Sequence, residues 1–335
     1  MQKNDLIVIA GAGGFIGGSL ARYFTNKGFT NIRAVDKKPI DQWYQKTPGV
    51  ENIPECDLNL RENCFKVCEG AVEVYNFAAD MGGMGFIENN KAECMLTVLI
   101  STHMLLAAKE VGKVERFFYS SSACAYNTQR QQETDVTALK ESDAYPAMAE
   151  DGYGWEKLFT ERMCRHFMED YGMETRVARF HNVYGPYGTW DGGREKAPAA
   201  ICRKVIAAKD AGSDEIEIWG DGEQTRSFMY IDDCVKGIDM ITHSDIREPI
   251  NLGSSELVSI NQLVDYAEEV GGVKLKRKYK LDAPKGVRGR NSDNTMIQAR
   301  LGWEPNLPLR EGIAKTYAWI EQQYADRKAG KPTVS

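Results

Sequence analysis

The sequence predicts an α/β fold built on a doubly wound parallel sheet. In the first half of the chain, short apolar runs alternate with helical patterns, and a glycine-rich turn joins the first run to the first helix. Polar residues also follow the carboxyl ends of several runs. Strands of a parallel sheet are buried on both faces and read as apolar runs, and helices usually connect them. Ligands of such sheets bind beyond the carboxyl ends of the strands.

The expected elements follow in a regular order. The run Leu-Ile-Val-Ile-Ala at 6–10 is a buried strand, and a helix extends from Phe15 to Lys27, where Gly28 ends it. Further apolar runs predict strands at 32–35, 72–76, 116–119 and 176–180. Helical periodicity predicts helices at 93–111, before Gly112, and at 153–171. The strand at 116–119 therefore delivers a serine run to the ligand-binding edge of the sheet.

The second half of the chain is expected to form a smaller lobe. From residue 181 the pattern loosens and becomes rich in glycine and proline, which favours loops and short helices. The apolar run 227–231 is expected to return to the main sheet, so the lobes interleave. We predict a Rossmann-like domain from 1–180 plus about 228–252, and a substrate lobe from about 181–227 plus 253–328. Residues 329–335 are expected to be a frayed tail.

Composition excludes several classes of function. The chain has 335 residues, 42% of them hydrophobic, and a net charge of -6, which argues against a nucleic-acid partner. No apolar run approaches the ~20 residues of a membrane span, and the start does not resemble a signal peptide, so we expect no membrane partner. Eight cysteines are too sparse for a disulfide scaffold, and Cys64 and Cys68 have no second pair, so no metal site is predicted. A reducing cytoplasmic location is expected.

The glycine-rich turn at 11–17 predicts a dinucleotide site. It follows a strand and opens a helix, which lets a pyrophosphate approach the positive end of the helix dipole. The predicted cofactor contacts in this turn are Gly11, Gly14, Phe15, Ile16 and Gly17. Asp36 ends the next strand at the spacing of a ribose ligand, and a carboxylate there repels a 2′-phosphate, which favours NAD over NADP. Lys37 and Lys38 directly follow Asp36, and their positive charges would instead favour the 2′-phosphate of NADP.

Asp57 and Leu58 follow the third expected strand. They suit either a contact with the adenine edge of the cofactor or a simple helix cap, and the sequence favours neither reading.

A redox site is predicted by Ser122, Tyr153 and Lys157. Tyr153 and Lys157 stand four residues apart and share one helix face. A lysine there lowers the pKa of the phenol and binds the nicotinamide ribose, so that Tyr153 acts as a base. Ser122 lies at a strand end and supplies a third polar group. A Tyr-x-x-x-Lys pair alone is common by chance, but together with the glycine turn it indicates oxidation of a hydroxyl by a nicotinamide.

The chain resembles the extended short-chain dehydrogenase/reductase family of nucleotide-sugar enzymes from Gly11 to about Trp303. The matching segments are 78–86, 121–124, 188–200, 219–228 and 287–294. Within this family they are similar to segments of enzymes that epimerise GDP-mannose at C3 and C5. The resemblance implies bound NAD, a transient ketone at C4 and GDP-L-galactose as product, with GDP-L-gulose when C5 alone inverts. Gly152 stands where those enzymes are expected to carry alanine.

Cys124 and Lys196 are the predicted proton-transfer pair. A ketone at C4 makes the hydrogens on C3 and C5 acidic, and inversion needs one group on each face of the sugar. A thiol suits this task when a nearby cation lowers its pKa. Without the resemblance, Cys124 reads as a buried filler and Lys196 as a solvated charge, since those are the usual roles of these residues. The resemblance assigns both to acid/base catalysis.

The resemblance also implies the substrate contacts. Arg226 and Arg290 clamp the diphosphate and ribose, with Arg288 as a second candidate. The remaining expected contacts are Gly82, Ser122, Cys124, Asn182, Glu195, Lys196, Ala197, Lys204 and Gln224. A homodimer formed through the helices at 93–111 and 153–171 is expected in this family.

Two alternatives stay open, and a third is disfavoured. A UDP-sugar 4-epimerase needs the same triad but neither Cys124 nor Lys196. A non-catalytic dinucleotide-binding module is the other alternative, although such proteins typically lose the tyrosine or lysine, and both Tyr153 and Lys157 are present. Related 4,6-dehydratases carry acidic residues after the strand-end serine, where this chain has Ala123 and Cys124, so dehydration is disfavoured.

Overall fold

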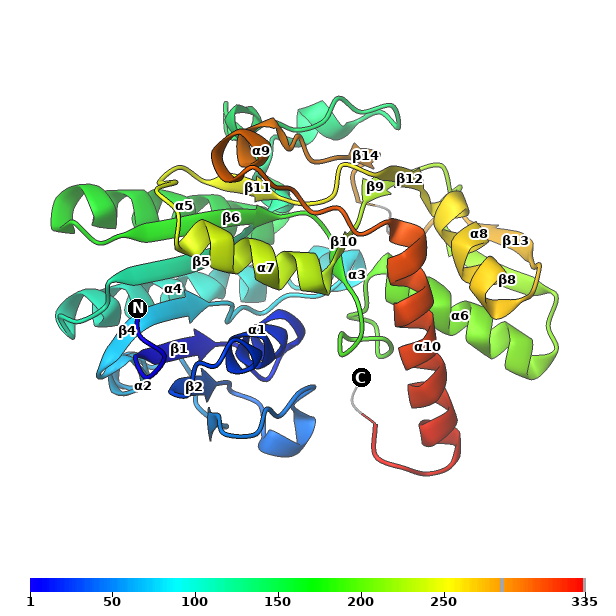
Figure 1. Ribbon diagram of the computed structural model, residues 1–335. Helices are drawn as coiled ribbons and strands as arrows, with labels where there is room; N and C mark the ends of the chain where they lie inside the picture. The colour runs from blue at the N-terminus through cyan, green and yellow to red at the C-terminus, as the bar shows by residue number, and fades with distance from the viewer. Residues whose placement is uncertain (284–285, 334–335) are drawn as a thin grey trace.

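The computed structural model describes residues 1–283 and 286–333 and contains a central sheet of seven parallel strands (Figure 1). The strand order is β11-β6-β5-β4-β1-β2-β3. These strands are β1 (Leu6–Ala10), β2 (Ile32–Val35), β3 (Glu51–Ile53), β4 (Ala71–Asn76), β5 (Arg116–Ser122), β6 (Thr175–Phe180) and β11 (Ile250–Leu252). The order reverses between β1 and β4, and this switch point is where a doubly wound sheet binds its ligand. The predicted fold class is therefore confirmed.

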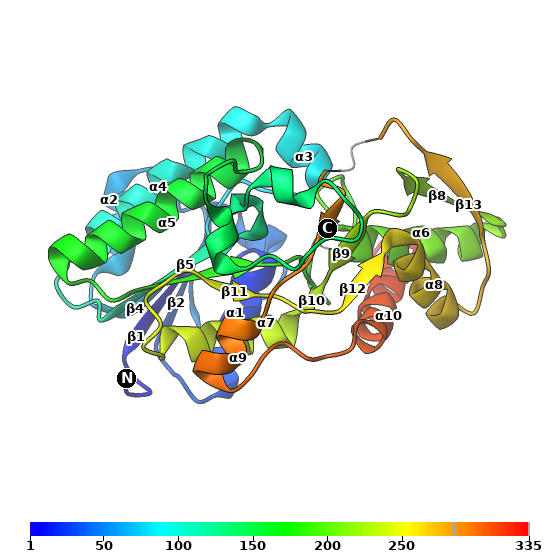
Figure 2. The same ribbon diagram turned by 90° about the horizontal axis from the view of Figure 1, so that it is seen from above.

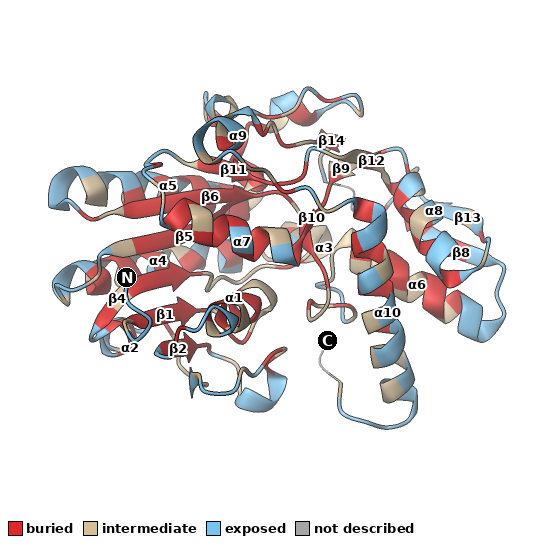
Figure 3. Cartoon of the chain, viewed as in Figure 1, coloured by how far each residue is buried: buried red, intermediate tan, exposed pale blue. Residues whose placement is uncertain are grey.

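Helices cover both faces of the sheet (Figure 2). One face carries α2 (Arg61–Cys68), α4 (Lys91–Glu110) and α5 (Asp151–Tyr171), and the other carries α1 (Phe15–Asn26) and α7 (Ile231–Thr242). Each layer buries its own apolar cluster against the sheet, and all five residues of β1 are buried between the layers (Figure 3). The predicted boundaries of α1, α4 and α5 lie within two residues of the observed ones.

A smaller lobe lies beside the carboxyl edge of the sheet (Figure 1). Its helices are α6 (Ala197–Ala211), α8 (Ile260–Gly271) and α10 (Leu309–Lys328), which pack on one another. Its strands are β8 (Glu215–Trp219) paired with β13 (Lys276–Lys280), and β12 (Leu257–Ser259), β9 (Thr225–Ser227) and β14 (Gly289–Arg290) in a second sheet. The remaining elements are α3 (Met84–Asn89), α9 (Thr295–Leu301) and the short helices η1 (Ile40–Gln42), η2 (Ala123–Ala125), η3 (Thr128–Gln131) and η4 (Glu141–Ala144).

The expectation that residues 227–231 return to the main sheet is wrong. Within this run β10 (Met229–Tyr230) pairs with β7 (Val183–Tyr184) in a separate two-stranded sheet. The chain rejoins the main sheet only at β11, beside β6. The strand is short because α7 starts at Ile231, and Asp232 and Asp233 stabilise the positive end of its dipole.

The carboxyl-terminal tail follows α10. Lys331 forms an ion pair of 2.9 Å with Asp326, so the first part of the tail is held against the helix. The predicted fraying of 329–335 stays a prediction, and residues 334–335 lie outside the described part of the chain.

Helix α4 is long and apolar enough, by length and composition alone, to cross a membrane. In the structure it packs against α2 and α5 on one face of the sheet. Core helices of globular proteins pass the same test, so this helix is weak evidence for a membrane span.

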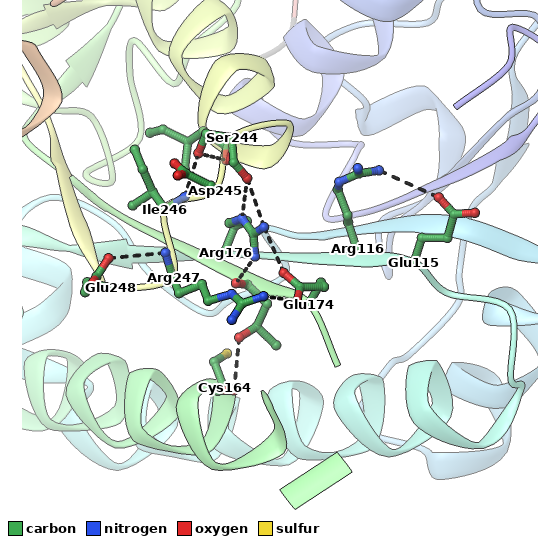
Figure 4. A network of polar contacts seen from close by, with 12 residues as sticks. Glu115, Arg116, Cys164, Glu174, Arg176, Ser244, Asp245, Ile246, Arg247 and Glu248 are labelled. Carbon is green, nitrogen blue, oxygen red and sulfur yellow. Dashed lines mark hydrogen bonds and ion pairs between the residues drawn. The ribbon is translucent and has the colours of Figure 1, made fainter. Parts of the chain in front are cut away.

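A polar network fixes the amino-terminal end of β6, opposite the ligand-binding edge (Figure 4). The buried Arg176 donates two hydrogen bonds, of 3.1 and 2.9 Å, to the carbonyl of Ser244 in the turn after α7. Glu174 pairs with Arg176 at 2.9 Å and with Arg247 at 2.8 Å. These bonds join β6 to the connection between α7 and β11 and so place the last strand of the sheet.

Candidate active site

A cavity of about 290 Å³ lies at the carboxyl edge of the sheet, at the switch point between β1 and β4. It is bounded by the turn after β1, the ends of β2, β4 and β5, the first turns of α5 and the loop before α6. The predicted site residues that line it are Gly11, Gly14, Phe15, Ile16, Gly17, Asp36, Asp57, Leu58, Gly82, Ser122, Tyr153, Lys157 and Lys196. The fold thus brings together segments that are up to 185 residues apart, from Gly11 to Lys196.

The glycine turn has the shape that a pyrophosphate requires. Gly11 has φ +81, and a Cβ there would lie 2.8 Å from the backbone nitrogen of Ala78. A Cβ on Gly17 would lie 2.5 Å from the carbonyl oxygen of Gly11. Only glycine permits this approach of the turn to β4 and of α1 to the turn. The turn therefore leaves the first amides of α1 open to an anion.

Asp36 lies at the wall of the cavity and is buried. Its carboxylate accepts hydrogen bonds of 3.0 Å from the amides of Gly13 and Lys38, which fix both oxygens in place. Lys37 is paired with Asp80 at 2.7 Å, and the amine of Lys38 lies 4.3 Å from the ring centre of Tyr44. Both lysines line the cavity together with these partners. The preference for NAD therefore rests on the fixed carboxylate of Asp36, which would repel a 2′-phosphate.

Asp57 forms a local turn and does not cap the following helix. Its Oδ1 accepts bonds of 2.9 Å from the backbone and side chain of Asn59, whereas α2 has Leu60 as its N-cap and no side-chain capping bond. Asp57 and Leu58 also line the cavity, next to Asp36. A structural turn therefore forms part of the wall that would face an adenine.

The triad residues meet where β5 ends and α5 begins. Tyr153 is 6% exposed and Lys157 is 2% exposed, and the Lys157 amine lies 5.4 Å from the ring centre of Tyr153. Helix α5 comes this close because of Gly154, where a Cβ would lie 2.2 Å from the carbonyl oxygen of Cys124. A Cβ on Gly152 would lie 2.4 Å from the carbonyl oxygen of Lys91, which explains glycine at this position.

The protonation of Tyr153 is dominated by burial. Burial and the neighbouring Cys124 and Glu156 raise the pKa of the phenol far above its ordinary value, and the hydrogen bond with Ser122 lowers it. Lys157 has a second neighbour, the buried Glu156, whose Oε2 lies 3.6 Å from its Nζ. In the protein alone the phenol is therefore protonated at neutral pH.

Cys124 lies in the short helix η2 directly after β5 and is 7% exposed. Its amide donates a 3.2 Å hydrogen bond to Ser122 Oγ, so the redox and proton-transfer residues are held together. The predicted cation is present, since Arg290 Nη1 lies 3.5 Å from the sulfur. Burial and Glu150 outweigh the effect of Arg290, however, and the pKa of Cys124 is raised rather than lowered.

Lys196 stands immediately before α6 and lines the cavity. Burial lowers the pKa of its amine, and the nearby Cys124 partly opposes this effect. A thiol with a raised pKa and an amine with a lowered pKa are closer together in proton affinity than the free side chains. Proton transfer between such groups and one carbon acid is correspondingly easier to balance.

The three predicted arginines have different surroundings. Arg290 is buried and forms an ion pair of 2.7 Å with Glu150. Arg226 donates to the carbonyls of Thr225 and Val287, and burial together with Arg290 lowers its pKa to about 10. Arg288 is paired at 2.8 Å with Asp221 near the surface. Arg226 and Arg290 are neighbours through the pairing of β9 with β14.

The other predicted substrate contacts lie outside the main cavity wall. Asn182 donates a 3.0 Å bond to the carbonyl of Ser227, and Lys204 donates a 2.9 Å bond to the carbonyl of Glu217. Gln224 donates to the carbonyl of Trp219, while its Oε1 is buried without a hydrogen-bond partner in the described chain. Glu195 pairs with Arg203 at 2.9 Å, and Ala197 begins α6. Carbonyls of β8 and β9 thus accept bonds from Asn182, Lys204 and Gln224, whereas Glu195 and Ala197 lie at the start of α6.

Sequence reasoning missed part of the cavity wall. Tyr44, Asp80, Thr189 and Arg194 also line it. The last three lie in the segments 78–86 and 188–200 that carry the family resemblance, and this is the signal that could have found them. Glu150 was missed too, although its place three residues before Tyr153 puts it at the start of the triad helix. Across residues 1–283 and 286–333, no three His, Cys, Asp or Glu side chains are arranged to hold a metal ion.

The chain is similar to known proteins along its whole length. Residues 7–253 match the model of the NAD dependent epimerase/dehydratase family. The chain is 47% identical to a GDP-mannose 3,5-epimerase of Arabidopsis thaliana, over 100% of this chain and 87% of the relative. It is 48% identical to GDP-mannose 3,5-epimerase 1 of Oryza sativa subsp. japonica, over 96% of this chain and 83% of the relative.

Solved structures support the fold. UDP-glucose 4-epimerase of Thermotoga maritima, solved with UDP-glucose, superposes with a TM-score of 0.82 and 24% identity, covering 95% of this chain and 99% of that one. At this identity the likeness concerns the fold alone. The chain belongs to the NAD dependent epimerase/dehydratase family, in which it resembles GDP-mannose 3,5-epimerases over its whole length.

Proposed function

We propose that this enzyme epimerises GDP-mannose at C3 and C5 through a transient ketone at C4, with bound NAD. The observation that carries the proposal is the position of Cys124 and Lys196 beside the Ser122, Tyr153 and Lys157 triad. A C4 epimerase needs only the triad. The likeness to curated GDP-mannose 3,5-epimerases supports the same substrate.

Residues of the cavity hold the cofactor and the reacting hydroxyl. The glycine turn binds the pyrophosphate, Asp36 the ribose hydroxyls of the adenosine half, and Lys157 those of the nicotinamide half. A bound nicotinamide would supply a positively charged, reversible hydride acceptor. Because its phenol is protonated in the protein alone, Tyr153 can remove the proton of the C4 hydroxyl only as the phenolate, a form that the positive charges of Lys157 and of a bound nicotinamide would favour. It later restores that proton.

Cys124 and Lys196 carry out the inversions. With a ketone at C4, removal of a proton from C5 or C3 gives an enolate, and a proton delivered to the opposite face inverts the centre. One of the two groups removes the proton and the other delivers one, so each inversion leaves both with changed protonation. Inversion at both carbons gives GDP-L-galactose, and inversion at C5 alone gives GDP-L-gulose.

The nucleotide diphosphate is held by the smaller lobe. Arg226 and Arg290, on the paired strands β9 and β14, supply fixed positive charge next to Cys124. Lys204 and the unpartnered Oε1 of Gln224 are polar groups available near β8 and β9 for the nucleotide. We expect the hexose to bind between the triad and the lobe.

Incubation with GDP-mannose in deuterated water tests the proposal. Product and recovered substrate should gain deuterium at C3 and C5, because those hydrogens leave as protons. C4 should stay unlabelled, because its hydrogen moves as hydride. Inversion at C4 without label at C3 or C5 would instead identify a 4-epimerase, and unchanged substrate in the presence of tightly bound NAD would identify a non-catalytic module.

The surface formed by α4 and α5 suggests a homodimer. Large apolar side chains are exposed on α4 and α5, which pack together on one face of the sheet: Met95, Leu96, Leu99, Trp155 and Phe159. Contiguous apolar patches of this kind usually mark protein interfaces. Light scattering should give a dimer mass for the wild type and a monomer mass for Leu96→Glu combined with Phe159→Glu. A monomeric wild type would end this proposal.

We also propose a reducing, cytoplasmic location, since all eight cysteines are free.

A further inference from the structure

Glu150 and Cys124 share one guanidinium group. Arg290 donates through Nη2 to Glu150 Oε2 at 2.7 Å and through Nη1 to Cys124 Sγ at 3.5 Å. Its Nε donates to Gln131 Oε1 at 2.6 Å, which fixes the plane of the group. The carboxylate of Glu150 therefore decides where the positive charge lies relative to the sulfur.

This cluster is closed to bulk water on the side of the sulfur. Arg290 is 5% exposed, Glu150 6% and Cys124 7%. The backbone adds a second link, because the amide of Glu150 donates a 2.9 Å bond to the carbonyl of Cys124. Charges act strongly on one another at such short range and low exposure.

Glu150 and Arg290 act on the thiol in opposite directions. After burial, which is the largest effect, Glu150 raises the pKa of Cys124 and Arg290 lowers it. Burial also raises the pKa of Glu150, but the charge and hydrogen bond of Arg290 outweigh it, so the pKa of Glu150 is lowered. Glu150 thus keeps its negative charge at neutral pH.

Other groups face the thiol from each neighbouring element. They are Tyr153 on α5, Arg226 on β9, Lys196 before α6, Cys94 on α4 and the hydroxyl of Ser122 on β5. Among these described neighbours of Cys124, Glu150 carries the negative charge. Arg226, Arg290 and Lys196 carry positive charges.

We propose that Glu150 is a positioning residue for Cys124: it holds Arg290 against the sulfur, and its own charge keeps Cys124 in the thiol form between turnovers. The inference rests on the proposed function only in that the proposed function assigns proton transfer to Cys124. Glu150 is also one of the residues that line a second, open cavity of about 540 Å³, together with Glu88, Gln132, Asp151 and Arg288.

Alkylation of the free thiol tests this without requiring turnover. The holoenzyme is treated with iodoacetamide between pH 6 and 10, and labelling of the peptide containing Cys124 is followed by mass spectrometry. Only the thiolate reacts. Glu150→Gln keeps an acceptor for Arg290 but removes the charge, and we expect alkylation of Cys124 to be about tenfold faster at pH 8.

The controls separate charge from packing. Glu150→Asp retains the charge but draws the carboxylate back from Arg290 by one methylene, so Cys124 should react more slowly in it than in Glu150→Gln. Glu88→Gln removes a charge from the same open cavity without contacting Arg290. Arg290→Gln should slow the alkylation of Cys124, in contrast to Glu150→Gln, because it removes the positive charge that lowers the pKa of the thiol. Should Glu150→Gln fail to fold, the double variant Glu150→Gln with Arg290→Gln, compared with Arg290→Gln alone, measures the same charge.

Equal or slower alkylation after loss of the Glu150 charge would overturn the proposal, as would an equal effect of Glu88→Gln. The proposed function fails separately, if Cys124→Ala still inverts the sugar.

Discussion

The hydroxyl groups of Tyr44 and Thr189 lie 2.7 Å apart and join two segments of the cavity wall that are 145 residues apart in the sequence. The segment after β2 is anchored by the buried Trp43, whose Nε1 donates a 3.0 Å bond to the carbonyl of Lys38. The loop before α6 is anchored at Trp190, whose carbonyl accepts a 3.1 Å bond from Arg203. Two fixed segments are thus joined at the wall of the cofactor cavity.

Loss of this contact should speed the release of NAD. In Tyr44→Phe the two segments lose one neutral hydrogen bond, worth about 1 kcal/mol, so bound NAD should dissociate roughly fivefold faster. The measurement is the NAD retained by purified protein during timed dialysis. Tyr171→Phe removes a hydroxyl from an exposed tyrosine and serves as the control. Identical retention in both variants would show that this contact does not hold the cofactor.

Tyr153→Phe should abolish turnover while binding persists. The ring and its packing stay, and only the hydroxyl that exchanges a proton with C4 is lost. Removal of such a group costs ~10²–10⁴-fold in rate. Calorimetry with GDP-mannose should give near wild-type affinity, and NAD content should be unchanged. Turnover close to wild type would remove Tyr153 from the redox step.

Five strands of the main sheet followed from the sequence, because β1, β2, β4, β5 and β6 are short runs of mostly buried side chains. The ranges of β3 and β11 were not predicted, and β3 (Glu51–Ile53) has no buried residue. Residues 6–10 form β1 with the predicted bounds, since every side chain of the run is buried. The run 227–231 was wrongly placed because an apolar run does not name its partner. Its pairing with β7 depends on the loop at 181–187, where Asn182 and Gly185 have positive φ, and this has no local signal.

The candidate site divides in the same way. The glycine turn, Asp36 and the Tyr153 and Lys157 pair are local patterns, and the structure brings them to one cavity. The pair of Glu150 and Arg290 joins residues 140 positions apart, and neither charge reveals its partner in the sequence. The upward shift in the pKa of Cys124 could not be predicted either, because it depends on burial and on that pair.

Cys124→Ser and Lys196→Ala should each stop inversion but differ in the exchange that remains. A hydroxyl has a far higher pKa than a thiol, so Cys124→Ser should lose label uptake from the face that Cys124 serves. Lys196→Ala should retain uptake at the carbon that Cys124 reaches unaided. Nuclear magnetic resonance of recovered GDP-mannose in deuterated water gives both values. Full inversion in either variant would contradict the two-group assignment.

His243 should make stability depend on pH in the alkaline range. Its Nε2 lies 3.0 Å from Glu73 Oε1 and its Nδ1 lies 2.9 Å from Asp239 Oδ1, so two carboxylates hold the charged ring between β4 and the end of α7. Hydrogen bonds to Asp239 and Glu73 raise the pKa of His243 from 6.5 to about 10. A raised pKa in the folded state stabilises the protein fully below the unfolded value, and this contribution disappears as the pH rises through the folded value.

The wild type should therefore lose stability between pH 6.5 and pH 10 relative to His243→Gln, whose side chain does not titrate. The ring is 32% exposed, so solvent reduces the effect to on the order of 2 kcal/mol. Thermal unfolding midpoints of both proteins, measured at pH 6, 8 and 10, test this expectation. The difference between the two midpoints should be largest at pH 6 and shrink steadily toward pH 10. A constant difference would mean that His243 contributes by packing alone, with no linkage between its proton and folding.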